Sequence, residues 1–211
     1  MKTKFGIVLI VLGAVLIFGA VGLFAYNSSL EEKAGEASDV IMPQLVEAIQ
    51  HRQEENPVQR LPQLPVALPD VEAREMPVVE IDGHSYIGFL TIPALNLERP
   101  VMADWDDDKL QIAPCRYSGS TYTEDLVIMA HNYWTHFGKL NQLKIGDQVL
   151  FTDMDGITTT YEVSARDVLA ATAVEEMTAG EYDLTLFTCT YGGKSRVTIR
   201  CSVAEPDQET E

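Results

Sequence analysis

The hydrophobic and polar positions divide this chain into three stretches with different periods. Residues 5–26 form an apolar run without a charged side chain, long enough for a helix across a hydrocarbon core of about 30 Å. Two lysines precede the run, whereas Glu31 and Glu32 follow it. The positive-inside rule therefore predicts a cytoplasmic tail at residues 1–4, a single-pass transmembrane anchor at residues 5–26 and an extracellular remainder. A cleaved signal peptide is the alternative, but its apolar region is ordinarily only about 7–15 residues long.

The second stretch, residues 27–83, shows no sustained period. Residues 40–49 have the character of a short amphipathic helix that Pro43 interrupts. Four prolines then fall within residues 56–69, and such segments favour extended, semi-rigid conformations. We predict an extracytoplasmic linker over residues 27–83 that lifts a folded domain off the bilayer, with disorder as the alternative.

The third stretch consists of short runs typical of β-strands, separated by turn residues. The runs cover residues 87–92, 126–130, 148–152, 158–165, 184–189 and 197–203. Helical signals are limited to short turns near residues 105–112 and 173–179. Many short strands with such links favour a closed barrel. We predict a mainly β domain with short helices over residues 84–205 and a polar tail over residues 206–211.

Alternation along the last two runs places two reactive side chains together. In the first run Leu184 and Leu186 share one face and Cys189 takes the other, because strand side chains alternate. In the second run Cys201 belongs to the apolar set, while Arg196 points the opposite way. We therefore expect Cys189 and Arg196 on the same outer face of adjacent strands and Cys201 in the core. The same parity argues against a Cys189–Cys201 disulfide.

Composition and charge narrow the classes of partner. The formal net charge of the 211 residues is −17, which argues against nucleic acid, whose phosphates need a basic surface. The three cysteines form no C-x-x-C pair, so a zinc site or a thioredoxin-like motif is not expected. A disulfide between Cys115 and Cys201 is possible if the domain is extracellular.

A thiol beside a guanidinium is a candidate nucleophile, because the cation favours the thiolate and can stabilise an oxyanion. Such a nucleophile also needs a proton carrier, usually histidine. His51 lies in the linker and His84 precedes the first clear run. His131 ends an apolar run, where a ring can enter a cleft, and is favoured over its rival His136.

Several of these residues stand in motifs of a known family. Residues 185–189 (TLFTC) followed by Arg196 resemble the TLxTC…R signature of sortases. The segment around His131, together with residues 137–140 (FGKL), is similar to the sortase histidine strand and its continuation. Residues 86–93 and Pro100 resemble the opening strands. The resemblance runs from about residue 86 to residue 203.

The resemblance implies a sortase β-barrel, a sortase catalytic domain and a thiol-dependent transpeptidation. Cys189 would attack a sorting signal of a surface protein, LPxTG- or NPxTN-like, and His131 would carry the proton. Arg196 would stabilise the oxyanion, and an amine of a cell-wall precursor or a pilin lysine would resolve the thioacyl intermediate. Three further residues would position the substrate: Thr188, Asn132 and Tyr191.

The subclass and two other functions stay open. The motifs look closest to class B, although the segment before the cysteine strand is short for that class. An inactive sortase-like binding module and a cysteine hydrolase that uses water are the alternatives. No cofactor is expected, because Asp106, Asp107 and Asp108 lack the spacing of an EF-hand calcium loop.

Overall fold

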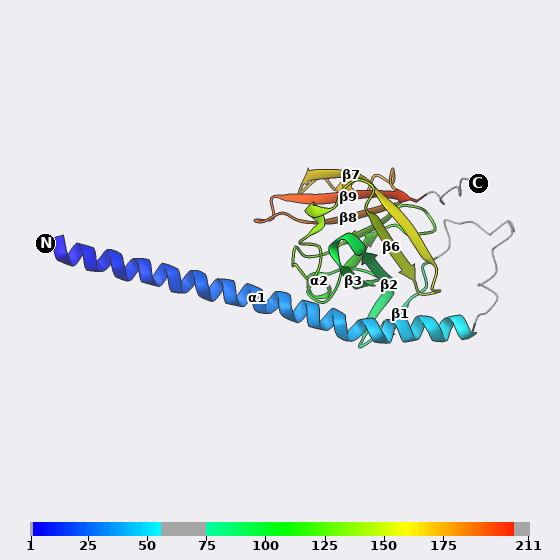
Figure 1. Ribbon diagram of the computed structural model, residues 1–211, viewed down its shortest axis with the longest axis horizontal. Helices are drawn as coiled ribbons and strands as arrows, with labels where there is room; N and C mark the ends of the chain where they lie inside the picture. The colour runs from blue at the N-terminus through cyan, green and yellow to red at the C-terminus, as the bar shows by residue number, and fades with distance from the viewer. Residues whose placement is uncertain (1, 56–74, 205–211) are drawn as a thin grey trace.

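A long helix, α1 (Lys2–Glu55), runs along one side of a closed β-barrel (Figure 1). This arrangement is that of a computed structural model that describes residues 2–55 and 75–204. The proline-rich part of the expected linker and the expected polar tail lie outside the described residues. The mainly β fold with a preceding helix is confirmed.

Eight strands close the barrel. The sheet order is β1-β2-β3-β4-β5-β8-β9-β7-β6, and a β2–β6 pairing joins its ends so that only β1 remains outside the ring. The strands are β1 (Val79–Ile81), β2 (His84–Ile92), β3 (Leu97–Met102), β4 (Cys115–Ser118), β5 (Leu126–Met129), β6 (Gln148–Asp153), β7 (Thr158–Ala170), β8 (Leu184–Cys189) and β9 (Ser195–Val203). The short helices are η3 (Pro93–Leu95), α2 (Asp107–Leu110), η4 (Leu140–Gln142) and α3 (Val174–Met177).

Gly88 allows β2 to pair with both β1 and β6 along the same edge. Tyr86 pairs with Val79 of β1, whereas Gly88 pairs with Asp153 of β6. Gly88 has a φ of 145°, and a Cβ at this position would overlap the Thr152 carbonyl oxygen. Glycine is therefore required where the barrel closes.

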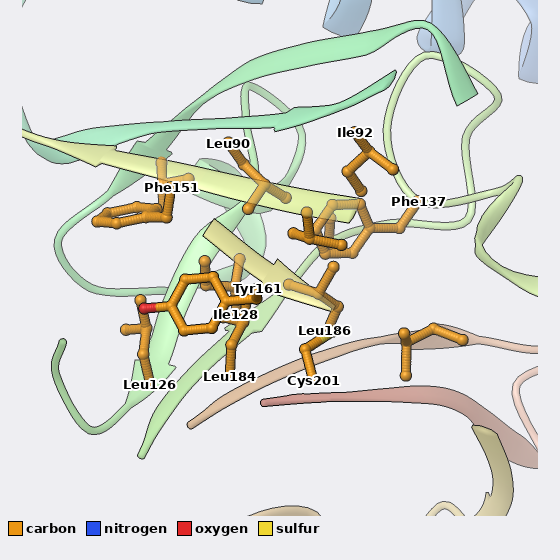
Figure 2. Packing of buried hydrophobic residues seen from close by; sticks show 14 of the residues in the cluster. Leu90, Ile92, Leu126, Ile128, Phe137, Phe151, Tyr161, Leu184, Leu186 and Cys201 are labelled. Atoms are coloured by element: carbon orange, nitrogen blue, oxygen red, sulfur yellow. The ribbon is translucent and has the colours of Figure 1, made fainter. Parts of the chain in front are cut away.

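Side chains of alternate strand positions fill the barrel interior (Figure 2). Leu184, Leu186 and Cys201 are fully buried there, as the alternation along the last two runs predicted. Phe151 and Tyr161, from β6 and β7, complete the same cluster. The inward set fixes the strand register, because a slip of one residue would turn every inward side chain outward.

The second half of α1 is docked on the barrel, and the predicted linker is therefore wrong for residues 27–55. Ile41, Leu45 and Ile49 recur every four residues and are buried against the outside of the barrel. Pro43 lies on the exposed side of the same helix, which continues through it. A proline costs a helix about 3 kcal/mol, but each buried aliphatic side chain contributes about 1.5–3 kcal/mol. The free energy gained by burying these side chains therefore exceeds the cost of Pro43 in the helix.

Polar contacts hold this half of α1 along its length. Two of these contacts are hydrogen bonds: Glu31 of α1 accepts from the Trp134 backbone N–H (2.7 Å), and Ser38 of α1 donates to the Ile112 carbonyl oxygen (2.9 Å).

The other two contacts are ion pairs. Asp39 of α1 pairs with Arg99 (3.0 Å), and Arg52 of α1 pairs with the buried Asp155 (2.7 Å). The docked helix and the barrel thus share one interface.

The first half of α1 projects beyond the barrel (Figure 1). Its large apolar side chains are exposed. Ile10, Phe18 and Phe24 are each more than 70% exposed. By length and hydropathy this part of α1 is a candidate membrane span, and no part of its most apolar window is buried in the protein.

Leu45→Ala tests the docking of α1. Leu45 is fully buried, so its truncation should lower the free energy of unfolding by about 2–5 kcal/mol. Val40 lies on the same helix and is 62% exposed, so Val40→Ala should change stability by less than about 0.5 kcal/mol. Chemical denaturation of the full chain in detergent, followed by fluorescence, gives both values. Equal effects of the two substitutions would show that the helix is not packed on the barrel.

Candidate active site

Three adjacent strands, β5, β8 and β9, bring the candidate catalytic residues into one row. Cys189 ends β8 and lies directly opposite Arg196 in the antiparallel β8–β9 pair. On the other side β8 pairs in parallel with β5, where Met129 is the partner of Phe187. If this register continues two residues past the end of β5, it brings His131 level with Cys189. Neighbouring strands are about 4.8 Å apart, and in-register side chains share a face.

Hydrogen bonds extend the β5–β8 register past the end of the strand. The Ala130 N–H donates to the Phe187 carbonyl oxygen (3.3 Å), and Thr188 Oγ1 donates to the Ala130 carbonyl oxygen (2.8 Å). The His131 carbonyl oxygen accepts from the Phe137 N–H (3.1 Å), and Phe137 is buried in the barrel core. The backbone of His131 is therefore fixed on both sides.

Cys189 is the one thiol that reaches the surface in the described part of the chain. It is partly exposed, whereas Cys115 and Cys201 are fully buried in two different clusters, and all three thiols are free. Burial raises the pKa of both Cys115 and Cys201 to about 12. Neither buried thiol can supply a thiolate near neutral pH, which leaves Cys189 as the candidate nucleophile.

The Arg196 guanidinium lies at the turn between β8 and β9. Its Nη1 donates to the carbonyl oxygens of Gly193 (3.0 Å) and Ser195 (3.2 Å). Arg200, the other arginine on this face, is buried and donates to the Met177 and Glu176 carbonyl oxygens and to Thr185 Oγ1. Arg200 is thus structural, and Arg196 is the partly exposed arginine beside Cys189.

The two candidate histidines differ in access. His131 is partly exposed; burial lowers its pKa, and the nearby Asp107 carboxylate partly opposes this shift. His136 is completely buried. Its pKa is lowered to about 4, first by burial and then by the charges of Arg99 and His131. A ring sealed from solvent cannot exchange protons with a substrate, so the geometry favours His131.

The three positioning residues lie in different surroundings. Thr188 is buried and its hydroxyl is committed to the Ala130 carbonyl oxygen, so it supports the His131 segment and not a substrate. Asn132 and Tyr191 line a common cleft, and Tyr191 is 88% exposed. Thr188 thus has an internal structural contact, whereas a ligand can reach Asn132 and Tyr191.

A buried apolar cluster covers the outer face of β5 and β8 next to the row. Val127 and Phe187 form a cluster there with Met177 of α3. Tyr117 packs edge-on against Phe187 with ring centroids 5.4 Å apart, and Trp105 stacks on Tyr117 at 5.6 Å. The face that alternation predicted to be outer is therefore covered by apolar groups up to the position of Cys189.

The acidic segment at residues 106–108 has a structural role in the described chain. The Asp106 side chain accepts from the Lys109 backbone N–H (2.7 Å) and so caps α2. Lys109 Nζ also contacts Asp104 at 2.6 Å. No group of three or more His, Cys, Asp or Glu side chains within residues 2–55 and 75–204 is arranged to hold a metal ion.

Two residues near the row were not predicted from the sequence to belong to the site. Tyr133 packs against His131 with ring centroids 4.9 Å apart, and Glu31 of α1 holds the backbone of Trp134. The aromatic cluster after His131 was visible in the sequence. The approach of Glu31 was not, because it depends on the docking of α1.

Comparison with known proteins agrees with this geometry. Residues 90–204, more than half of the chain, match the family model of the sortase domain. The chain therefore belongs to the sortase family, a family of cysteine transpeptidases. No curated protein matches the sequence.

Solved structures of similar proteins share the fold. Sortase C1 from Streptococcus suis is 27% identical with a TM-score of 0.50, over 60% of this chain and 76% of that one. Sortase C from Streptococcus pneumoniae is 20% identical with a TM-score of 0.54, over 83% and 100% of the two chains. Sortase A from Corynebacterium diphtheriae is 19% identical with a TM-score of 0.53, over 87% and 95%. The class B resemblance stays a prediction, since these structures carry the designations C and A.

The buried His136 should make stability depend on pH. Its pKa is about 4 in the folded protein against 6.5 for an exposed histidine, so the unfolded chain binds the proton first as the pH falls. Its contribution is complete above pH 6.5 and is lost as the pH falls towards 4, by about 3 kcal/mol in total.

His136→Phe should therefore lose about 2–3 kcal/mol less stability than the wild type between pH 7 and pH 4.5. Denaturation curves at the two pH values measure this difference. His51→Phe, at an exposed position on α1, is the control and should keep the wild-type pH dependence. Parallel behaviour of wild type and His136→Phe would contradict the buried, neutral state of His136.

Proposed function

We propose that this chain is a membrane-anchored sortase that cleaves a C-terminal sorting motif and transfers the protein to an amine. The motif would be LPxTG- or NPxTN-like, and the acceptor an amine of a cell-wall precursor or a pilin lysine. The pairing of Cys189 with Arg196, with His131 two residues past the end of the neighbouring strand β5, is the observation that carries this proposal. These residues would supply a nucleophile, a guanidinium and a proton carrier.

The acylation step uses all three groups. His131 takes the proton from the Cys189 thiol as the sulfur attacks the carbonyl carbon of the sorting motif. The lowered pKa of His131 fits this start, because a neutral imidazole can accept the proton. The guanidinium of Arg196 stabilises the tetrahedral oxyanion. Collapse breaks the C–N bond, the imidazolium protonates the leaving amine, and a thioester remains on Cys189.

The second step reverses the proton path. His131 takes a proton from the incoming amine, whose nitrogen then attacks the thioester carbon. The C–S bond breaks, a new amide forms, and the proton returns to the sulfur. Transfer to an amine instead of water distinguishes a transpeptidase from a hydrolase.

The Trp105–Tyr117 ring stack supports binding of a peptide near the row. Trp105 is 44% exposed, whereas Val127, Met177 and Phe187 are buried in the cluster that Tyr117 contacts. A peptide on the exposed rings would lie next to the strand that ends at Cys189. The exposed apolar half of α1 supports anchoring with the N-terminus in the cytoplasm and the barrel on the outer surface.

Substitution of the row tests the proposal directly. Cys189→Ala should abolish cleavage of fluorogenic LPxTG and NPxTN peptides, because the acyl intermediate cannot form. His131→Ala should lower the rate by at least about 10²-fold, the usual contribution of general acid–base catalysis. Arg196→Lys should also be slow, because lysine lacks the planar fork. Cys115→Ala, which removes a buried thiol, is the control and should retain cleavage.

Two outcomes would overturn this proposal. Cleavage that is unaffected by added triglycine would identify a hydrolase. A Cys189 thiol that is inert to a labelled methanethiosulfonate, together with peptide binding but no cleavage, would identify a binding module.

A further inference from the structure

A cleft separates α1 from the loop that follows His131. Its volume is about 530 Å³, and its walls include Phe24 and Glu31 of α1, Tyr133 and Trp134 of the loop, and Tyr191 of the β8–β9 turn. The β8–β9 turn lies at the end of the barrel from which the apolar half of α1 projects (Figure 1). The cleft therefore opens where the barrel meets the candidate membrane span.

The residues of the cleft are close in sequence to two residues of the row. Asn132 in its wall directly follows His131, and Tyr191 is two residues past Cys189. The Tyr133 ring packs against the His131 ring. A molecule in this cleft therefore lies next to the two segments that carry the imidazole and the sulfur.

The chemistry of the cleft suits a primary ammonium group. Glu31 is the only ionisable carboxylate in its described lining, which contains no lysine or arginine. One Glu31 oxygen accepts from the Trp134 N–H, and no cationic side chain in residues 6–55 or 75–204 forms a salt bridge with Glu31. The pKa of Tyr133 is raised by burial and then by the negative charge of Glu31.

Aromatic rings complete this environment. Phe24, Tyr133, Trp134 and Tyr191 all line the cleft, and ring faces attract ammonium groups. Trp134 already shows this attraction, since Lys139 Nζ lies 5.5 Å from the centroid of its ring. A carboxylate among aromatic rings is a typical site for an alkylammonium ion.

We propose that the cleft between α1 and the residue 131–136 loop binds the ammonium group of the acceptor substrate, with Glu31 as its counter-charge. This inference rests on the proposed transpeptidase function and names the part of the site that receives the second substrate. The bound ammonium gives one proton to His131, which later releases it to solvent. The free amine attacks the thioester carbon, and as the C–S bond breaks and the amide forms, the second proton of the nitrogen passes to the Cys189 sulfur. The docked half of α1 thus forms one wall of the acceptor site.

Glu31→Gln tests the proposal while keeping an oxygen for the Trp134 N–H. The full chain in dodecyl maltoside micelles, which carry no amine, is given an intact sorting peptide with triglycine or Nα-acetyl-lysine methylamide. The ratio of amide product to hydrolysis product should fall about tenfold at a fixed, subsaturating amine concentration, the loss of one charge-assisted contact. Glu32→Gln, which neutralises the exposed neighbour on α1, should keep the wild-type ratio. The two amines distinguish an N-terminal from a lysine acceptor.

Two results would overturn the acceptor site. An unchanged product ratio in Glu31→Gln would show that the carboxylate does not hold the amine. An unchanged ratio with a raised KM for the peptide would assign the cleft to the sorting peptide.

A binding measurement separates this inference from the proposed reaction. In a Trp105→Phe, Cys189→Ala background, Trp134 is the only tryptophan, and its fluorescence should saturate as lysine methylamide is added. Glu31→Gln in that background should weaken the apparent affinity about tenfold. If the amine binds saturably but the parent protein cleaves no peptide, only the proposed function is refuted. If the parent protein cleaves peptide but Trp134 fluorescence does not respond to the amine, only the acceptor site is refuted.

Discussion

The parallel pairing of β5 with β8 is the contact on which the catalytic geometry depends. These strands are far apart in sequence, and their register, continued two residues past Met129 and Phe187, brings His131 level with Cys189. The antiparallel β8–β9 pair then adds Arg196 on the other side. The inward leucines of β8 fix this register, because a slip of one residue would exchange the core face for the catalytic face. Thr188 strengthens the pairing beyond the strand through its hydrogen bond to Ala130. Core packing and catalytic alignment therefore have the same origin.

The docked half of α1 gives the barrel a fixed position relative to the candidate membrane span. A helix rises about 1.5 Å per residue, so α1 spans about 80 Å as one continuous element. Its buried leucine and isoleucine side chains join the second core cluster, and Glu31 reaches the loop after His131. The candidate span and the site are thus connected through a packed interface.

Much of the site could be predicted from the sequence, because strand alternation is a local property. The limits of β8, the core position of Cys201 and the opposition of Cys189 to Arg196 all agree with that reading. His131 was favoured over His136 by its place at the end of an apolar run and by the family resemblance, and the burial of His136 gives this choice a physical reason. Docking of α1 could not be predicted, since Pro43 signalled a break and the buried stripe gains its stability only from the barrel. The short β4 was missed because its four residues lack a clear alternation.

Cross-strand disulfide formation is the most direct measurement of the row itself. Residues side by side on neighbouring strands have Cα atoms about 4.5–5.5 Å apart, within the range of about 4.4–6.8 Å that a disulfide spans. The variants His131→Cys and Arg196→Cys would each be oxidised in the folded protein, and the disulfides mapped by peptide mass spectrometry. The account predicts that Cys189 pairs with the new cysteine in both variants and stays reduced in His136→Cys. Cys189 remaining reduced in His131→Cys, or pairing instead in His136→Cys, would contradict the alignment of β5, β8 and β9.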